Sequence, residues 1–252
     1  TDNWKKHIIK LVFKILYYFI VCDEIIVSSA DRGANIVLDF FCKIKTKKKI
    51  YYFVIGGSLY RNIILKKWNK EIYDRLEMIY VEANSLKCDL EMLGLKNVTQ
   101  LNNFRKVDDF ENKYQKEDYI KFVYYGRVIK EKGIEHAIEL IKKLNLNGYE
   151  SKLHIYGQCE EEYLNQLQSK FDENITYFGS IKPNNKTEYE TLSQYDVFVF
   201  PTEYPGECLP GALIDSYVSG LAVIVSEWKY AKEYVEDNRN GIIFKYQNYN
   251  DR

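Results

Sequence analysis

The stretch VFVFPTEYPGECLPGALIDSYVSGLAVIVS, residues 197–226, decides the fold. It begins with an apolar run at 197–201 and passes through a loop rich in proline and glycine. It continues as an apolar helix-like segment at 211–219 and ends in a second apolar run at 222–226. Short apolar runs on either side of a helix predict a βαβ unit with parallel strands. Ligands bind beyond the carboxyl ends of such strands, so the loop between strand and helix is the first candidate site.

The same alternation extends over the second half of the chain, and it predicts an α/β fold with a parallel sheet flanked by helices. The predicted strands there are 120–125, 152–156, 175–178, 197–201, 222–226 and 241–244, and the predicted helices are 133–145, 160–170, 186–194, 211–219 and 229–236. In the first half we predict helices at 4–21 and 34–43, and strands at 24–29, 50–55 and 78–81.

A length of 252 residues suggests one or two domains. The 36 basic and 36 acidic side chains cancel, which argues against a nucleic-acid-binding protein. Residues 1–110, however, hold 19 basic and 13 acidic side chains, whereas residues 111–252 hold 17 and 23. This asymmetry predicts a domain boundary near residue 110, with the polar residues 105–118 as a linker.

The cysteines and histidines exclude two further classes of protein. The five cysteines are scattered without a CxxC pair, which indicates reduced thiols in a cytoplasmic protein. No histidine lies near another His or Cys at metal-ligand spacing, so we expect no metal site. The chain begins without methionine and stops directly after a strand-like run, so we expect a fragment of a longer protein.

The predicted helix at 4–21 is apolar and carries Lys6, Lys10 and Lys14 on one face. Its lysines argue against a membrane span. Two interpretations remain open: a basic amphipathic helix on an anionic membrane surface, or a helix packed on a sheet with its lysines in water.

Two loops that follow predicted strands carry glycine. Gly56 and Gly57 follow the strand at 50–55, where they would either let a ligand approach the backbone or form an ordinary tight turn. Gly126 follows the strand at 120–125, with Arg127 and Lys132 behind it. Two cations at a strand end suit a diphosphate, although a solvated loop would show the same residues.

The loop after residues 197–201 has the features of an anion site. Pro210 suits the first turn of a helix, and Gly211 lacks a Cβ that would block a ligand. The free amides of 211–213 would then face an anion. Glu207 precedes this helix and Asp215 lies inside it, and carboxylates at these places can accept hydrogen bonds from hydroxyl groups.

These residues resemble a known family. Glu207-x7-Asp215 resembles the Glu-x7-Glu signature of retaining GT-B glycosyltransferases of family 4, and Gly126-Arg127 with Lys132-Gly133 resembles their diphosphate-binding loop. The sequence around Glu207 is similar to that of a subgroup that builds bacterial capsules, exopolysaccharides or O-antigens. The resemblance covers about 118–250. It implies two Rossmann-like domains: an incomplete acceptor-side domain at 1–110, and a donor-binding domain at 111–252 that lacks its final helix.

The resemblance also implies roles for single residues. Arg127 and Lys132 would hold the diphosphate, Glu207 the donor sugar and Asp215 the ribose. The remaining donor-binding positions would be Gly126, Gly179, Ser180, Leu209, Pro210, Gly211 and Ala212, and the acceptor-side loop would be Gly56 and Gly57. Two positions depart from the family: the second acid is Asp215 instead of Glu, and Ile55 stands where a His is frequent.

The implied activity is transfer of a sugar, with retention, from a UDP- or GDP-sugar to a lipid-linked or growing glycan. No metal or other cofactor would be required. The protein would be cytoplasmic, with its basic half near the inner face of the membrane and no nucleic-acid partner. Two alternatives remain: a nucleotide-sugar epimerase of the same fold, and a non-catalytic nucleotide-sugar-binding subunit of a polysaccharide assembly complex.

Overall fold

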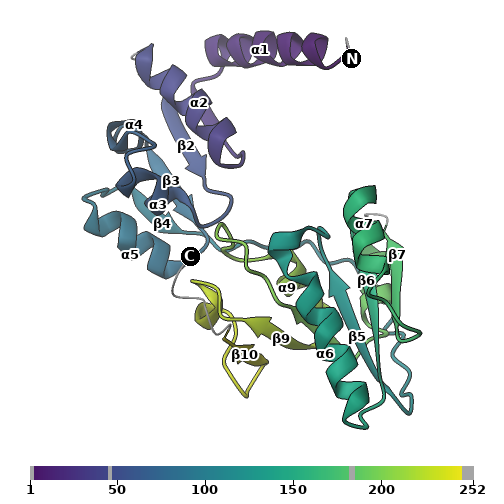
Figure 1. Ribbon diagram of the computed structural model, residues 1–252. Helices are drawn as coiled ribbons and strands as arrows, with labels where there is room; N and C mark the ends of the chain where they lie inside the picture. Colours follow the sequence, from purple (N-terminus) through teal and green to yellow (C-terminus); the bar gives the residue numbers. More distant parts are fainter. Residues whose placement is uncertain (1–2, 45–46, 182–184, 246–252) are drawn as a thin grey trace. The chain divides into compact units, whose positions relative to one another are not determined.

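The computed structural model describes residues 3–44, 47–181 and 185–245. The chain divides into two compact units, Thr1–Leu101 and Asn102–Arg252, and each contains one parallel sheet (Figure 1). The division lies before the predicted boundary near residue 110. The reason is that the predicted linker is bonded to the second unit: the Lys113 amide donates to Ser193 Oγ at 3.0 Å and the Tyr114 hydroxyl to Asp196 at 2.7 Å.

The first unit is a four-stranded parallel sheet in the order β1-β2-β3-β4. Apolar side chains at alternate strand positions and on one face of the longer helices form its core, including Leu38, Tyr52, Ile79, Leu86 and Leu90. Its elements are α1 (Asn3–Val21), β1 (Glu24–Val27), α2 (Asp31–Lys43), β2 (Lys49–Phe53), α3 (Leu59–Ile64), α4 (Lys70–Asp74), β3 (Met78–Val81), α5 (Asn84–Met92) and β4 (Val98–Gln100).

Helix α1 is held to this unit mainly through its carboxyl-terminal part. The Phe19 ring stacks on Phe41 at 4.7 Å, and Lys48 Nζ donates to the carbonyl oxygens of Ile20 and Cys22 at 2.9 and 2.6 Å. Other apolar side chains of the helix stay exposed, such as Phe13 at 68%. Lys10 and Lys14 are also exposed, and the side chain of Lys6 lies outside the described residues. No helix in the described part of the chain is long and apolar enough to cross a membrane.

The second unit is a six-stranded parallel sheet in the order β10-β9-β8-β5-β6-β7. Its elements are β5 (Ile120–Tyr125), the 3-10 turn η1 (Lys130–Lys132), α6 (Ile134–Leu146), β6 (Ser151–Tyr156), α7 (Glu161–Gln168), β7 (Ile175–Gly179), α8 (Asn185–Leu192), β8 (Val197–Phe200), α9 (Gly211–Val218), β9 (Ala222–Ser226), the 3-10 turn η2 (Ala231–Glu233) and β10 (Ile242–Phe244). All strand pairs in this sheet are parallel, as the βα alternation predicts.

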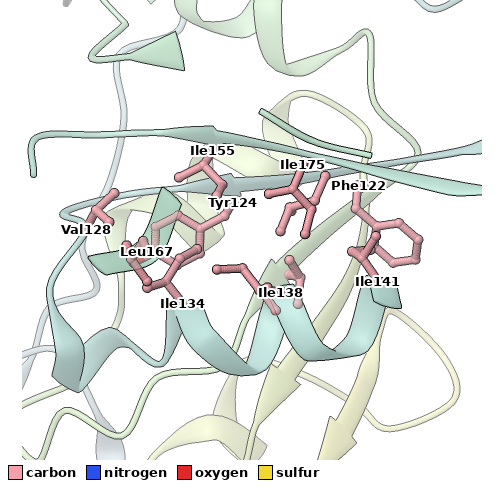
Figure 2. Packing of buried hydrophobic residues seen from close by; sticks show 12 residues of the cluster. Phe122, Tyr124, Val128, Ile134, Ile138, Ile141, Ile155, Leu167 and Ile175 are labelled. Atoms are coloured by element: carbon pink, nitrogen blue, oxygen red, sulfur yellow. The ribbon is translucent and has the colours of Figure 1, made fainter. Parts of the chain in front are cut away.

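The core of the second unit lies between α6 and the β5–β6 part of the sheet (Figure 2). Ile134, Ile138 and Ile141 recur at helical spacing and are buried together against the sheet. The strands contribute alternate residues to the same layer, among them Tyr124 and Ile155. This packing fixes the direction in which α6 and η1 leave the end of β5.

The predicted helix at 229–236 is wrong, because this segment forms only the short turn η2. Tertiary packing outweighs its helical propensity. The Trp228 indole donates to the Cys208 carbonyl oxygen at 3.0 Å, and its ring packs edge-on against Phe200. Trp228, Tyr230 and Val235 are all buried, a spacing that one helix face cannot provide.

Candidate active site

The strand order of the second unit changes direction between β5 and β8. The chain runs from β5 to β6 on one side, whereas β8 pairs with β5 on the other side. The loops after β5 and β8 therefore leave the sheet side by side at their carboxyl ends, which is where parallel sheets bind ligands. The Glu203 amide donates to the Glu131 carbonyl oxygen at 2.8 Å and ties the two loops together.

Lys132 and Glu207, from these two loops, form a buried ion pair through Nζ and Oε2. Their side chains are only 11% and 10% exposed. The Lys132 ammonium also lies 5.1 Å from the centre of the Phe200 ring, and the Thr202 hydroxyl donates to Glu207 at 3.2 Å. Two predicted site residues that are 75 positions apart in the sequence are thus in direct contact.

The glycine after β6 lets the loop after β5 pass close to the sheet. A Cβ added at Gly157 would lie 1.6 Å from the Gly126 carbonyl oxygen, and its φ of +148° is rare for other residues. The Tyr124 hydroxyl donates to the Arg127 carbonyl oxygen at 2.8 Å, which holds the backbone of Arg127 in place. Burial, followed by the nearby Glu207 charge, raises the pKa of Tyr124, so this hydroxyl stays protonated.

Arg127 is exposed and lines a cavity of about 510 Å³. Ser180, from the end of β7, lies on the wall of the same cavity, together with Gln158 and Cys159 from the loop after β6. Burial raises the pKa of the Cys159 thiol, so it lies in the cavity as a neutral group. Glu160 also lines the cavity, so it combines one guanidinium and one carboxylate with neutral polar groups. Such a lining suits a ligand with an anionic part at Arg127 and hydroxyl groups elsewhere.

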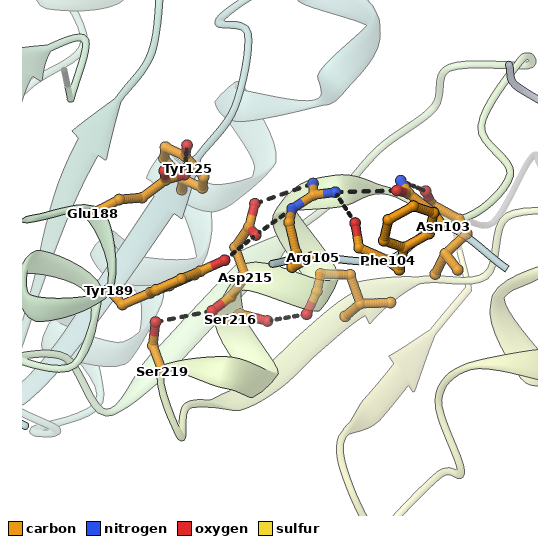
Figure 3. A network of polar contacts seen from close by, with 11 residues as sticks. Asn103, Phe104, Arg105, Tyr125, Glu188, Tyr189, Asp215, Ser216 and Ser219 are labelled. Atoms are coloured by element: carbon orange, nitrogen blue, oxygen red, sulfur yellow. Dashed lines mark hydrogen bonds and ion pairs between the residues drawn. The ribbon is translucent and has the colours of Figure 1, made fainter. Parts of the chain in front are cut away.

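Helix α9 begins where the sequence predicts. Pro210 is its N-cap, with φ −62°. The expectation that the amides of 211–213 are all free is wrong for Leu213, because its amide donates to the Pro210 carbonyl oxygen at 3.1 Å. Asp215, inside the helix, is only 4% exposed, and Arg105 Nε donates to its Oδ1 at 2.7 Å (Figure 3). Burial alone would lower the pKa of Arg105, but the hydrogen bond to Asp215 raises it above its usual value.

Residues 106–251, more than half of the chain, match the family described as "Glycosyl transferases group 1". The chain belongs to this family. A poly(ribitol-phosphate) alpha-N-acetylglucosaminyltransferase of Staphylococcus aureus is 24% identical over 177 residues, which are 69% of this chain and 34% of that protein. The capsular polysaccharide biosynthesis glycosyltransferase CapM of S. aureus is 30% identical over 159 residues, which are 60% of this chain and 40% of CapM.

Solved structures agree with this fold. TarM of S. aureus superimposes with a TM-score of 0.70 at 19% identity, over 94% of this chain and 49% of TarM. Anabaena HepE superimposes with a TM-score of 0.64 at 10% identity, over 87% of this chain and 64% of HepE. The α/β prediction of two parallel, GT-B-type sheets is thereby confirmed. This group 1 chain spans between about a third and two thirds of the length of these proteins.

The predicted residues whose contacts or places are described above fall into three sets. Lys132 pairs with Glu207, and Arg127 shares a cavity with Ser180. Asp215 is bonded to Arg105 and Tyr189 instead. The third set, Gly56 and Gly57, lies in the first unit between β2 and α3. The roles that the family resemblance implies for all of these residues stay predictions.

Sequence reasoning missed some polar partners in the second unit. Arg105 stands in a segment interpreted as a linker, and only its contact with Asp215 shows that it belongs to the site. His136 Nε2 lies 2.8 Å from Glu203 Oε1. His136 belongs to the same stretch of chain as Lys132, and Glu203 to the same loop as Glu207. In the described part of the chain, no group of three or more His, Cys, Asp and Glu side chains could hold a metal ion.

Proposed function

We propose that this chain is part of a retaining hexosyltransferase of bacterial surface-polysaccharide synthesis, of the family 4 type. It transfers a sugar from a nucleotide-diphosphate sugar to a lipid-linked or growing glycan. The buried Lys132–Glu207 pair carries this proposal, together with Arg127, which precedes Lys132 in the same loop and lines the cavity. Lys and Glu side chains are almost never fully buried unless they are paired, and this pair lies at the ligand edge of a parallel sheet.

The charges suit departure of a nucleoside diphosphate. Negative charge develops on the phosphate oxygen as its bond to the sugar C1 breaks, and preorganised cations stabilise such charge most where water is excluded. Lys132 is 8% exposed, so its ammonium acts in a largely water-free setting. Arg127 is exposed and adds a two-pronged contact from the cavity side. Glu207 accepts hydrogen bonds from donor-sugar hydroxyl groups.

Retention requires that the acceptor approach the same face of the sugar that the diphosphate leaves. The acceptor oxygen forms a bond to C1, the bond from C1 to the phosphate oxygen breaks, and the acceptor proton passes to that phosphate oxygen. No protein nucleophile, metal or other cofactor takes part in this scheme. The TarM and HepE structures contain UDP or UDP-glucose, which supports a uridine donor as the first one to test, with a GDP-sugar as the second.

Titration of UDP and GDP against the chain tests the donor site. We expect the Arg127→Ala and Lys132→Ala variants to bind about tenfold or more weakly, since each removes a charge-assisted contact. Lys130→Ala is the matched control, because Lys130 belongs to the same short turn but is exposed. If neither nucleotide binds the parent chain, or if all three variants bind equally well, the donor assignment is wrong.

We also propose that the basic first unit works at the inner face of the cytoplasmic membrane. Lys10 and Lys14 are exposed on α1 beside exposed apolar side chains, a combination that suits an anionic lipid surface. A lipid-linked acceptor would be found at the same surface. Co-sedimentation with vesicles that contain anionic lipid tests this part of the proposal independently of nucleotide binding.

A further inference from the structure

The segment Asn103–Arg105 contacts the loop before α9 and the helix itself (Figure 3). The Asn103 side-chain amide donates to the Leu209 carbonyl oxygen at 3.5 Å. Arg105 reaches Asp215 with two nitrogens, Nε at 2.7 Å and Nη2 at 3.4 Å. One short stretch of chain therefore holds the predicted donor loop at Leu209 and the helix behind it at Asp215.

The Arg105 guanidinium is built into this place. Its Nη1 donates to Asn103 Oδ1 and to the Phe104 carbonyl oxygen, both at 3.1 Å. Together with the two contacts to Asp215, these bonds engage all three nitrogens of the planar group. A guanidinium whose nitrogens are all engaged by the protein is oriented by the fold, so its position does not depend on a bound anion.

Gly211 makes room for this guanidinium. A Cβ added at Gly211 would lie 2.0 Å from Arg105 Nη2, closer than any real contact. The backbone conformation of Gly211 is not one that requires glycine, since its φ lies outside the left-handed range. A side chain at this position would therefore push the end of Arg105 out of its contacts with Asp215, so Gly211 leaves the space that these contacts use.

The acceptor atoms of Asp215 are largely used. Oδ1 accepts from Arg105 Nε and from the Tyr189 hydroxyl at 3.4 Å, and Oδ2 accepts from Arg105 Nη2. The carboxylate is 4% exposed, so a ligand would have to displace protein groups to reach it. The side chain is also one methylene shorter than the Glu of the family signature and is turned toward the arginine.

We propose that Arg105 and Asp215 form a positioning pair, in which Asp215 anchors Arg105 and the anchored Asn103–Arg105 segment holds the Cys208–Gly211 loop for the donor diphosphate. Asp215 then serves the arginine instead of the ribose. This inference rests on the proposed function, and it gives Arg105 and Asp215 a positioning role in the same donor site. The pairing also neutralises a carboxylate that would otherwise lie near the bound diphosphate and repel it.

Two nucleotide comparisons separate this role from ribose binding and from a merely structural role. The first is the affinity ratio of UDP to UMP, which reports contacts with the second phosphate. The second is the affinity lost when UDP is replaced by its 2′-deoxy or 3′-deoxy form, which reports contacts with the ribose hydroxyl groups. Calorimetry with the full chain measures both, with the guanosine nucleotides run in parallel.

We expect Arg105→Gln to lower UDP affinity about tenfold and UMP affinity much less, because the phosphate loop loses its support. Asp215→Asn gives the same pattern, and the affinity that it loses on replacing UDP by deoxy-UDP is unchanged. The Arg105→Gln/Asp215→Asn double variant binds UDP no more weakly than either single variant. Arg105→Lys restores only part of the UDP to UMP ratio. Lys113→Gln is the matched control, because Lys113 lies further along the predicted linker 105–118 and pairs with Glu190 of α8 at 3.1 Å.

Three outcomes would overturn the inference. The deoxyribose penalty could disappear in Asp215→Asn, which would place the ribose on Asp215. The UDP to UMP ratio could stay constant in the Arg105 variants, or it could fall equally in Lys113→Gln. If Asp215→Asn fails to fold, the Arg105→Met/Asp215→Leu double variant, which leaves no unpaired charge, gives the same comparisons. If the parent chain binds none of the nucleotides, the proposed function fails as well, which distinguishes the two.

Discussion

The contact between Gly157 and Gly126 gives the sharpest prediction for the fold of the site. Replacing Gly157 by alanine places a Cβ 1.6 Å from the Gly126 carbonyl oxygen and 2.7 Å from its carbon, both of which are backbone atoms. Backbone cannot swing aside as a flexible side chain can. The Gly126–Arg127 loop must therefore move away from the end of β6, and the proposed diphosphate site moves with it.

Two contributions set the magnitude. A φ of +148° is strained for alanine, which costs about 1–3 kcal/mol, and forcing an extra carbon into a packed place costs about 1–3 kcal/mol more. Gly148→Ala is the matched control, because Gly148 has a φ of +83° with nothing within 4 Å of the added Cβ. Only the strain of about 1–2 kcal/mol then remains. Gly157→Ala should therefore lose about 2–3 kcal/mol more in the free energy of unfolding than the control.

Urea denaturation followed by circular dichroism measures this difference. With a slope of about 2 kcal/mol per molar urea, the midpoint of Gly157→Ala should lie about 1 M below that of Gly148→Ala. UDP affinity should fall in Gly157→Ala and stay unchanged in Gly148→Ala. Equal midpoints for the two variants would show that the loop relaxes without cost, and the packing argument would then be refuted.

Three further predictions concern charge. Lys132→Met should lower kcat for sugar transfer about 100-fold or more, whereas exposed Lys130→Met should not, as steady-state assays would show; equal losses would contradict the role of the buried ammonium. Burial and then the Lys152 charge lower the pKa of His154 below 6.5, so this residue stabilises the fold fully above pH 6.5 and loses that contribution on acidification. Urea midpoints between pH 7.5 and 5 should therefore fall less in His154→Asn than in the parent; parallel curves would contradict this. Lys10→Gln/Lys14→Gln should weaken binding to anionic vesicles by about 2 kcal/mol, roughly 30-fold; unchanged sedimentation would remove the membrane proposal.

The sequence predicts the strands and the site loops for one physical reason. Apolar runs such as 120–125 are long enough to be buried strands, and parallel strands bring their carboxyl ends to one edge of the sheet. The contact between Lys132 and Glu207 follows from that topology, although the two residues are far apart in the chain. What the pattern cannot specify is whether the two side chains meet each other or a ligand.

The Arg105–Asp215 pair shows where sequence reasoning fails. Polar residues at 105–118 have the same composition whether they form a free linker or pack on a domain, so the pattern cannot tell these cases apart. The partners are 110 positions apart, and no periodicity connects them. The failed helix at 229–236 has a related cause, because the place of Trp228 is decided by the distant carbonyl group of Cys208.

The net charge of the second half does not indicate an anionic ligand, and the ion pairs explain how the two are compatible. The second half of the chain carries an excess of six acidic side chains, yet the proposed ligand is a diphosphate. The two carboxylates of the site, Glu207 and Asp215, are each paired with a cation, Lys132 and Arg105. Because these two pairs cancel, neither carboxylate opposes exposed Arg127, which presents its positive charge to the cavity. Because solvent screens charges beyond about 8–10 Å, these five groups outweigh the distant acidic surface.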